Sequence, residues 1–120
     1  MTSTQIVKAG RLHRKSKILR RWKLNWFVLY STGELKYFES EHSFEPEETI
    51  VMFAECKSIR TNEQCHSDPP EGLGRDCLLS LYDAENESLL SLCAESPDDA
   101  LALAYMLEQA RVNRPPPHIT

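Results

Sequence analysis

The spacing of the apolar residues changes at Ser96, and this change limits what the chain can fold into. Before Ser96, apolar residues stand in short runs of near-alternate spacing, separated by glycine, proline and other turn formers. Such runs are typical of β-strands. After Ser96 they recur at helical spacing, at Ala100, Leu103, Ala104, Leu107 and Ala110. The sequence therefore predicts a set of short strands followed by one amphipathic helix.

The predicted helix has a recognisable start and end. A hydroxyl N-cap, a proline at the first helical position and two acidic residues begin it, from Ser96 to Asp99. The apolar stripe continues to about Arg111, and the three consecutive prolines beyond it cannot extend a helix. We therefore expect one domain over residues 1–113 and the start of a proline-rich linker over residues 114–120.

Seven strands are expected before the helix. The fold class is mostly β with one C-terminal α-helix: a seven-stranded antiparallel barrel or sandwich whose open end the helix covers. An OB-type barrel is disfavoured, because it usually has five strands and places its helix within the strand order. The acidic segment 41–49 and the segment 62–75 are predicted to be exposed loops. The expected strands are residues 6–14, with a bend or bulge, 22–30, 34–40, 49–53, 56–61, 77–83 and 88–94.

The composition excludes several classes of protein. A chain of 120 residues suits one domain, and no apolar run approaches the roughly 20 residues of a spanning helix. Its four cysteines form no CxxC pair, which favours a reducing cytosolic compartment. Nucleophile elbows, HExxH, P-loops and dinucleotide turns are missing, so no enzyme, catalytic residue or cofactor is expected. Cys65 and His66 lack the spacing of a zinc site, so no metal is expected.

The basic residues are concentrated at one end of the chain. Eight of the 14 lysines and arginines lie within residues 1–33, whereas all 18 acidic residues lie at Glu34 or later. The first segment therefore carries a net charge of +8 and the remainder −12. This asymmetry predicts a molecule that turns one end toward a negatively charged surface.

Strand alternation places some of these cations together. Arg21, Lys23 and Asn25 share one face of the second predicted strand, while the tryptophans between them share the other. Arg14 ends the first strand, only a short loop away. We expect Arg14, Arg21 and Lys23 to bind an anionic head group. Nucleic-acid binding favours aromatic residues interleaved with cations on one face, whereas here the tryptophans lie on the face opposite the cations. No nucleic-acid partner is therefore expected.

The loop between these strands combines cations with bare aliphatic residues. Lysine and arginine gather phosphate or carboxylate, while aliphatic side chains can enter the acyl boundary, so this mixture favours a membrane interface. The alternative is that Ile18 and Leu19 fold back into the core and the cations are a solvated face. The predicted supporting membrane contacts are Arg11, Lys15, Lys17, Ile18, Leu19 and Arg20.

At this point the chain resembles the pleckstrin-homology domain, and more narrowly the evectins, family B of the proteins that contain this domain. The wider resemblance rests on G-R-L-x-R (10–14), R-W-K-L-N-W-F-V-L (21–29), G-E-L-K-Y-F (33–38) and the closing helix. The narrower one rests on I-L-R-R-W-K-L-N-W-F (18–27), S-I-R-T-N-E-Q-C (58–65) and L-C-A-E-S-P-D-D (92–99). The resemblance covers nearly the whole chain.

The resemblance implies a choice of ligand. Many phosphoinositide-binding members have an arginine where this chain has Asn25, which implies specificity for phosphatidylserine rather than multiply phosphorylated inositides. It also implies head-group contacts from Arg14, Arg21 and Lys23, and a peripheral protein of the cytoplasmic face of recycling-endosome and post-Golgi membranes that acts in membrane trafficking. A phosphoinositide, or a protein partner bound by the same fold, are the alternatives.

Two further features of the sequence are compared with the family pattern. Leu103 stands where the wider family usually buries a tryptophan, an exchange that the fold is expected to tolerate. Evectins resemble proteins with a hydrophobic C-terminal anchor, so Pro115 to Pro117 would begin the link to one.

Overall fold

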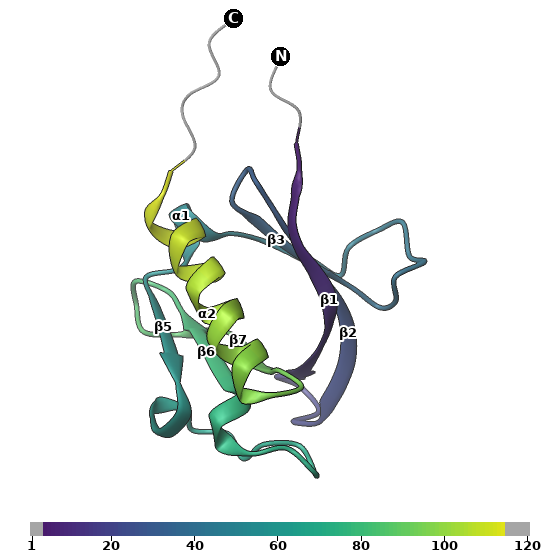
Figure 1. Ribbon diagram of the computed structural model, residues 1–120, viewed down its shortest axis with the longest axis vertical. Helices are drawn as coiled ribbons and strands as arrows, with labels where there is room; N and C mark the ends of the chain where they lie inside the picture. Colours follow the sequence, from purple (N-terminus) through teal and green to yellow (C-terminus); the bar gives the residue numbers. More distant parts are fainter. Residues whose placement is uncertain (1–3, 115–120) are drawn as a thin grey trace, which may run out of the picture.

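Alternating apolar and polar residues form seven antiparallel strands in the computed structural model, which describes residues 4–114 (Figure 1). Over these residues the strand order is β4-β3-β2-β1-β7-β6-β5. The two outermost strands do not pair with each other, so the sheet folds as a sandwich rather than a closed barrel. The predicted fold class is confirmed. The strands are β1 (Ile6–Lys15), β2 (Trp22–Tyr30), β3 (Glu34–Phe38), β4 (Glu48–Val51), β5 (Ser58–Thr61), β6 (Leu78–Tyr82) and β7 (Ser88–Cys93).

The two neighbours of β1 hold it very differently. β2 pairs with it from Ile6 to Lys15, with a register shift between Ile6 and Lys8. The expected bulge is therefore in β1, but before Gly10. β7 pairs with β1 only at His13 and Arg14. Among residues 4–114, one edge of β1 thus has no strand partner over most of its length.

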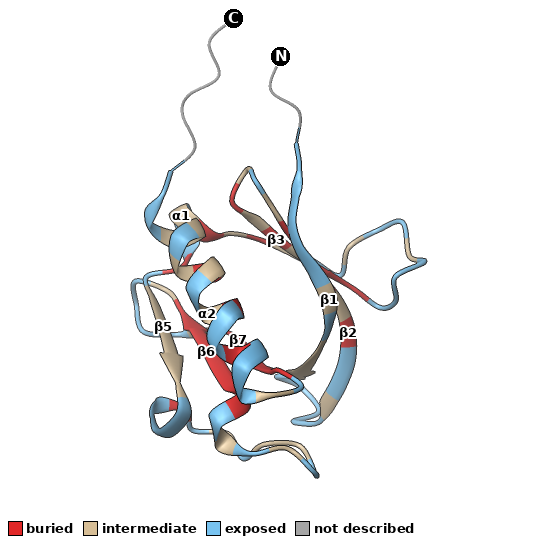
Figure 2. Cartoon of the chain, viewed as in Figure 1, coloured by how far each residue is buried: buried red, intermediate tan, exposed pale blue. Residues whose placement is uncertain are grey.

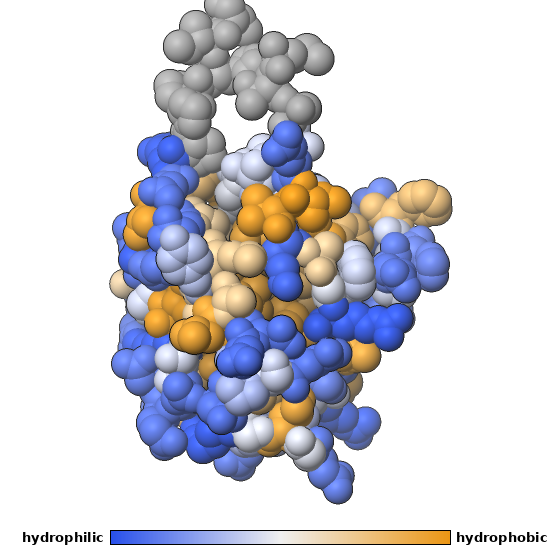
Figure 3. Space-filling model, in the orientation of Figure 1, coloured by the Kyte–Doolittle hydropathy of each residue, from blue (hydrophilic) through white to orange (hydrophobic). Residues whose placement is uncertain are grey.

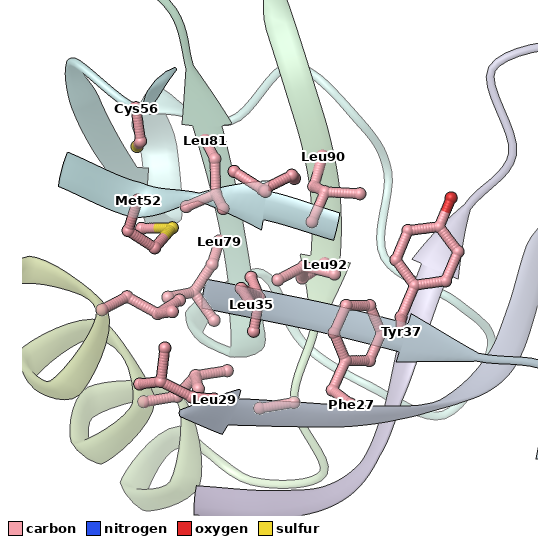
Figure 4. Packing of buried hydrophobic residues seen from close by; sticks show 14 of the residues in the cluster. Phe27, Leu29, Leu35, Tyr37, Met52, Cys56, Leu79, Leu81, Leu90 and Leu92 are labelled. Carbon is pink, nitrogen blue, oxygen red and sulfur yellow. The ribbon is translucent and has the colours of Figure 1, made fainter. Parts of the chain in front are cut away.

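The core lies between the two halves of the sheet and α2 (Pro97–Val112) (Figure 2). Figure 4 shows leucines from both halves meeting at its centre, with Phe27 and Tyr37 toward one end. Leu79, Leu81 and Leu107 are fully buried, and each such side chain contributes about 1.5–3 kcal/mol relative to exposure. The core therefore joins strands that are far apart in sequence.

Helix α2 begins and ends through side-chain contacts. The Ser96 Oγ accepts a hydrogen bond from the Asp99 backbone N–H at 3.1 Å, which confirms the predicted N-cap. Near the other end, the Arg111 guanidinium pairs with Glu108 and donates to the Lys57 carbonyl at 3.1 Å. The hydrogen bond that the Arg111 guanidinium donates to the Glu108 carboxylate lowers the pKa of Glu108. The ion pair lies within α2 and orients Arg111, and the hydrogen bond to the Lys57 carbonyl attaches the end of α2 to the segment before β5.

Two sequence predictions are wrong. Residues 49–53 were expected to be one strand, but α1 (Met52–Glu55) replaces its end. The Met52 N–H donates to the Gly33 carbonyl at 2.9 Å, and the Met52 side chain is fully buried. The helical turn therefore directs the apolar residue into the core where the chain leaves β4.

The segment 62–75 is not simply an exposed loop. It contains η1 (Asn62–Gln64) and leads into η2 (Arg75–Cys77). Cys65 is buried in a second small cluster with Cys77, Leu78 and Cys93, against which Trp22 and Leu73 pack. Burial of the thiol, together with the apolar neighbours, attaches this segment to the sheet.

The predicted linker falls mostly on residues 115–120, which lie outside the described residues. Within the described part, no helix is long and apolar enough to span a bilayer. All four cysteines are free thiols.

Buried thiols make the fold sensitive to alkaline pH. Burial, with smaller contributions from Cys77 and Cys65, raises the pKa of Cys93 from 9.0 to about 12. Burial likewise raises the pKa of Cys56 and of Cys77. Between pH 9 and 12 the unfolded chain releases a Cys93 proton that the folded chain retains, so the free energy of unfolding decreases as pH rises.

We therefore expect the melting temperature to fall between pH 9 and 12, with a shallower fall in Cys93→Ala. Thermal denaturation followed by circular dichroism measures both slopes. Identical slopes in the two proteins would show that Cys93 does not contribute.

Candidate functional site

The connection between β1 and β2 is a closed loop with defined internal hydrogen bonds. The Ser16 N–H donates to the Arg21 carbonyl at 2.8 Å, and the Arg20 N–H donates to the Ser16 carbonyl at 2.8 Å. The Ser16 Oγ also accepts from the Leu19 N–H at 3.2 Å. Arg20 adopts a positive φ of 54°, a left-handed conformation that few non-glycine residues adopt. These contacts hold the loop tip in one place.

Arg14 is positioned by uncharged groups. Its Nε donates to the Asn25 Oδ1 at 3.0 Å, and its guanidinium lies 4.5 Å from the centre of the Tyr37 ring. The Asn25 Nδ2 in turn donates to the Phe38 carbonyl at 3.1 Å. The Tyr37 ring packs beside Phe27, with its hydroxyl directed away from the core (Figure 4). Strand, amide and ring together orient the guanidinium toward the end of the sandwich.

Asn25, the residue expected to determine lipid specificity, does not present its amide to a ligand. Only 4% of the residue is exposed, and its amide oxygen and nitrogen already bond Arg14 and Phe38. Alternation did place Asn25 on the face of Arg14, but the register of β1 with β2 puts it inside the sandwich. Asn25 can therefore affect lipid specificity only indirectly, by positioning the Arg14 guanidinium and by adding no charge of its own.

A cavity of about 320 Å³ opens beside Arg14. Lys23 pairs with Arg14 across the β1–β2 ladder and is exposed, and Arg21 closes the loop. Neither Lys23 nor Arg21 lines this cavity. Both lie next to Arg14 at the start of β2, outside the cavity wall. The lining residues are Arg14, Lys15, Ser16, Lys17, Ile18, Tyr37, Glu48, Leu89 and Leu90.

The cations of this hairpin are not neutralised. Among residues 4–114, no carboxylate lies within 4 Å of the charged nitrogens of Arg14, Arg21 or Lys23, nor of those in the loop between them. Glu48 is the one acidic residue in the described lining of the cavity. The site can therefore hold an anion, with one carboxylate available to a positively charged group.

Ile18 and Leu19 project into solvent at the loop tip. Ile18 is 92% exposed and Leu19 is 59% exposed. The alternative that these side chains fold into the core is wrong. The predicted juxtaposition of bare aliphatic residues and cations is therefore present on the surface.

Other predicted contacts are arranged around this loop. Lys15, Lys17 and Arg20 line a second hollow of about 430 Å³ on its other side, with His66 and Ser67. The Trp22 indole N–H fixes the segment that forms the far wall, by donating to the Asp68 carbonyl at 2.9 Å.

Arg11 does not join the cluster. It lies three residues before Arg14, on the opposite face of β1, and its guanidinium is 3.5 Å from Glu41. Arg11 therefore forms an ion pair with a carboxylate, whereas the other cations predicted to contact the membrane form none among residues 4–114.

Sequence reasoning missed Tyr37 and Glu48. Both belong to the next hairpin, where they pair with each other across β3 and β4. The alternation of the 34–40 run placed Tyr37 on the inner face with Leu35, which was the available signal. Nothing in the described residues groups three histidine, cysteine or acidic side chains as a metal site.

Comparison with known proteins identifies the family. The family model described as "PH domain" matches residues 1–69, more than half of the chain. The chain belongs to the PH domain family. The resemblance on which the sequence analysis relied is therefore confirmed.

Family B members are among the relatives of this PH domain. It is 44% identical over 108 residues to Pleckstrin homology domain-containing family B member 2 of Mus musculus, covering 89% of this chain and 48% of the relative. Identity to family B member 1 of Homo sapiens is 42% over 106 residues, covering 88% and 43%. The chain thus spans about half the length of these relatives.

The fold is similar to solved PH domains. The C-terminal PH domain of pleckstrin, solved in complex with an inositol pentakisphosphate, matches with a TM-score of 0.71 and 18% identity, covering 92% of this chain and 99% of that one. At this identity the likeness concerns the fold alone.

Proposed function

We propose that this PH domain docks on anionic membranes through the β1–β2 loop, and that phosphatidylserine is the lipid whose head group it binds. The observation that carries the proposal is the unpaired cation cluster around Arg14 and Lys23, next to the exposed Ile18 and Leu19. Cytoplasmic leaflets are negatively charged, and each lysine or arginine near such a surface contributes about 1 kcal/mol.

The two parts of the loop region act on different parts of the lipid. Cations attract the phosphate and carboxylate from solution, and this attraction weakens within a Debye length. The aliphatic side chains act only after contact, because burying apolar area in lipid contributes about 25 cal/mol per Å². Their adjacency favours a membrane over a soluble anion as the physiological partner.

The charges of the cavity favour a zwitterionic head group with a net negative charge. Phosphatidylserine carries a phosphate and a carboxylate, which suit Arg14 in the cavity and Lys23 beside it, and an ammonium, which suits Glu48. A multiply phosphorylated inositol ring has no group for that carboxylate. Asn25 adds no positive charge to offset the desolvation of several phosphates. A phosphoinositide is the alternative, and pleckstrin's PH domain in its complex with an inositol phosphate exemplifies that chemistry.

The resemblance of the sequence to the evectins implies a location as well as a ligand. We propose that the domain reads phosphatidylserine on the cytoplasmic face of recycling-endosome and post-Golgi membranes in trafficking. The chain covers only about half of these relatives, so this part of the proposal concerns the domain and not the activity of a whole protein.

Lipid choice is tested by sedimentation with liposomes that contain phosphatidylserine or a phosphoinositide at equal total negative charge. We expect the wild type to prefer phosphatidylserine. Lys23→Ala should weaken this binding several-fold, because it removes a cation near the head group. Lys57→Ala is the matched control, since Lys57 is an exposed cation remote from the loop. Equal losses in the two variants, or a preference for the phosphoinositide, would contradict the proposal.

Glu48→Gln distinguishes recognition of the ammonium from general attraction. Removing a carboxylate should strengthen attraction to any anionic surface, yet we expect Glu48→Gln to bind phosphatidylserine vesicles more weakly, by several-fold, because the ammonium loses a charged partner. Vesicles of phosphatidylglycerol, which has no ammonium, should be bound equally well or better. Glu47→Gln is the control at the adjacent exposed carboxylate. An increase with both lipids would show that Glu48 contacts no ammonium.

The aliphatic residues are tested by Ile18→Ser combined with Leu19→Ser. Because both side chains are exposed, we expect an unchanged melting temperature and unchanged affinity for soluble phosphoserine. Binding to phosphatidylserine vesicles should fall at least about tenfold, since the apolar area can no longer enter the bilayer. Calorimetry and vesicle sedimentation make the comparison. Undiminished vesicle binding would limit the interaction to the head group.

A further inference from the structure

The free edge of β1 is a second place where this domain can bind a partner. Pairing with β7 stops at His13, so the edge of residues 8–12 that faces away from β2 has no strand partner among residues 4–114. In an antiparallel ladder, alternate residues direct their N–H and C=O groups toward each edge. An edge of this kind is a template for another extended chain.

A cavity of about 170 Å³ lies between this edge and α2. Its apolar lining includes Phe27, Leu29, Leu35 and Leu103. Gly10 lies opposite Phe27 in the ladder, and a Cβ built at Gly10 would meet nothing within 4 Å. The missing side chain thus leaves part of the core accessible. A cavity of about 150 Å³ can hold benzene, so this one can accept a single bulky apolar side chain.

Figure 3 shows hydrophobic surface over the start of β1 and over α2, on the two sides of this hollow. At the start of β1, Ile6 is 61% exposed. Leu101 is 74% exposed, but it lies on the face of α2 opposite Asp99 and Leu103 and is not part of the cavity rim. A partner that follows the edge would therefore pass the exposed apolar start of β1.

The charged residues at the rim of the cavity indicate which residue type would lie next to the inserted apolar side chain in a bound partner. Glu95 and Asp99 line the cavity on the α2 side, and no cation lies within 4 Å of either carboxylate in the described part of the chain. On the strand side, Lys8 and Arg11 also line the cavity; Arg11 is paired with Glu41, and neither cation lies within 4 Å of Glu95 or Asp99. An added strand would direct residues two apart toward the same face. A basic residue two positions from the anchor would thus face these carboxylates.

We propose that the β1 edge binds an extended peptide segment of another protein, which adds to β1 as a strand and inserts one bulky apolar side chain into the cavity, with a basic residue two positions away. Main-chain hydrogen bonds would supply affinity and the cavity specificity, as in other strand-addition complexes. A second copy of β1 fits less well, because its residue at the centre of the edge is Gly10, which has no side chain to insert.

Gly10→Leu fills the cavity from the strand side. No positive φ is found at Gly10, and its Cβ position is open, so we expect the variant to fold. Ala84→Leu adds the same apolar bulk at an exposed residue away from the edge and is the matched control. If Gly10→Leu fails to fold, Leu103→Phe fills the same cavity from α2.

The probe is a displayed library of random twelve-residue peptides, selected on the purified domain. We expect enrichment of peptides with an apolar residue two positions from a basic one, and changes in the amide resonances of residues 8–12 on binding. Affinity should fall at least about tenfold with Gly10→Leu and remain unchanged with Ala84→Leu. Glu95→Lys should select against the basic residue. Vesicle binding by Gly10→Leu should match wild type, which separates this site from the lipid site.

Several results would overturn the proposal. One is a selection without a shared pattern, and another is a set of peptides that bind Gly10→Leu as tightly as wild type or shift amides elsewhere. A concentration-dependent dimer in analytical ultracentrifugation, abolished by Gly10→Leu, would assign the edge to a second copy of the chain.

Discussion

Unequal pairing on the two edges of β1 determines most of what this domain presents to its surroundings. β2 fixes the register along the whole strand, whereas β7 contacts it only at His13 and Arg14. That register places Gly10, Leu12 and Arg14 in succession on the inner face. The same face therefore begins as a cavity wall, continues as core and ends in a cation. The peptide site lies along the part of β1 that β7 leaves unpaired, and the lipid site lies at the end of β1 that β7 does pair.

The way Arg14 is held explains how a fixed cation can remain available. An ion pair would orient a guanidinium but would also neutralise it and occupy its donors. Here an amide oxygen and an aromatic ring position it instead. Asn25 is itself fixed by the Phe38 carbonyl, so little side-chain entropy remains to be lost when an anion binds. The buried amide thus serves the site by organising the cation, at the position where a longer charged side chain would have contacted the ligand.

Local patterns predicted the parts of the fold that local physics decides. The N-cap at Ser96 and the helical stripe depend on residues within a few positions of one another, and both were predicted. Strand alternation put Asn25 on the face of Lys23, and the register with β1 makes this the face of Arg14. It could not show that Asn25 is buried, because that depends on the register with β1 and on a carbonyl of β3.

The errors concern contacts between distant segments. Residues 49–53 contain an apolar run that suits a strand or a buried helical turn equally well, and the contact of Met52 with Gly33 selects the turn. Turn-forming residues around Cys65 predicted exposure, yet the thiol is buried with Cys77, Leu78 and Cys93, which follow it by at least twelve positions, and Trp22 from β2 packs against this cluster. Tyr37 and Glu48 join the site through the β3–β4 register. Alternation within residues 34–40 indicated the inward direction of Tyr37, but no signal near the residues concerned indicates which distant segment each of them contacts.

The placement of the two sites allows both to be occupied together. Gly10 and Arg14 are four residues apart, which corresponds to roughly 13 Å along an extended strand. The β1–β2 loop lies at one end of the sandwich, whereas the described chain begins and ends at the other (Figure 1). A domain that inserts Ile18 and Leu19 into a bilayer would therefore direct the N-terminal part of β1 away from the lipid. The free edge and its cavity would then face the aqueous side, where a protein segment can reach them while the head group occupies the Arg14 end of the same strand.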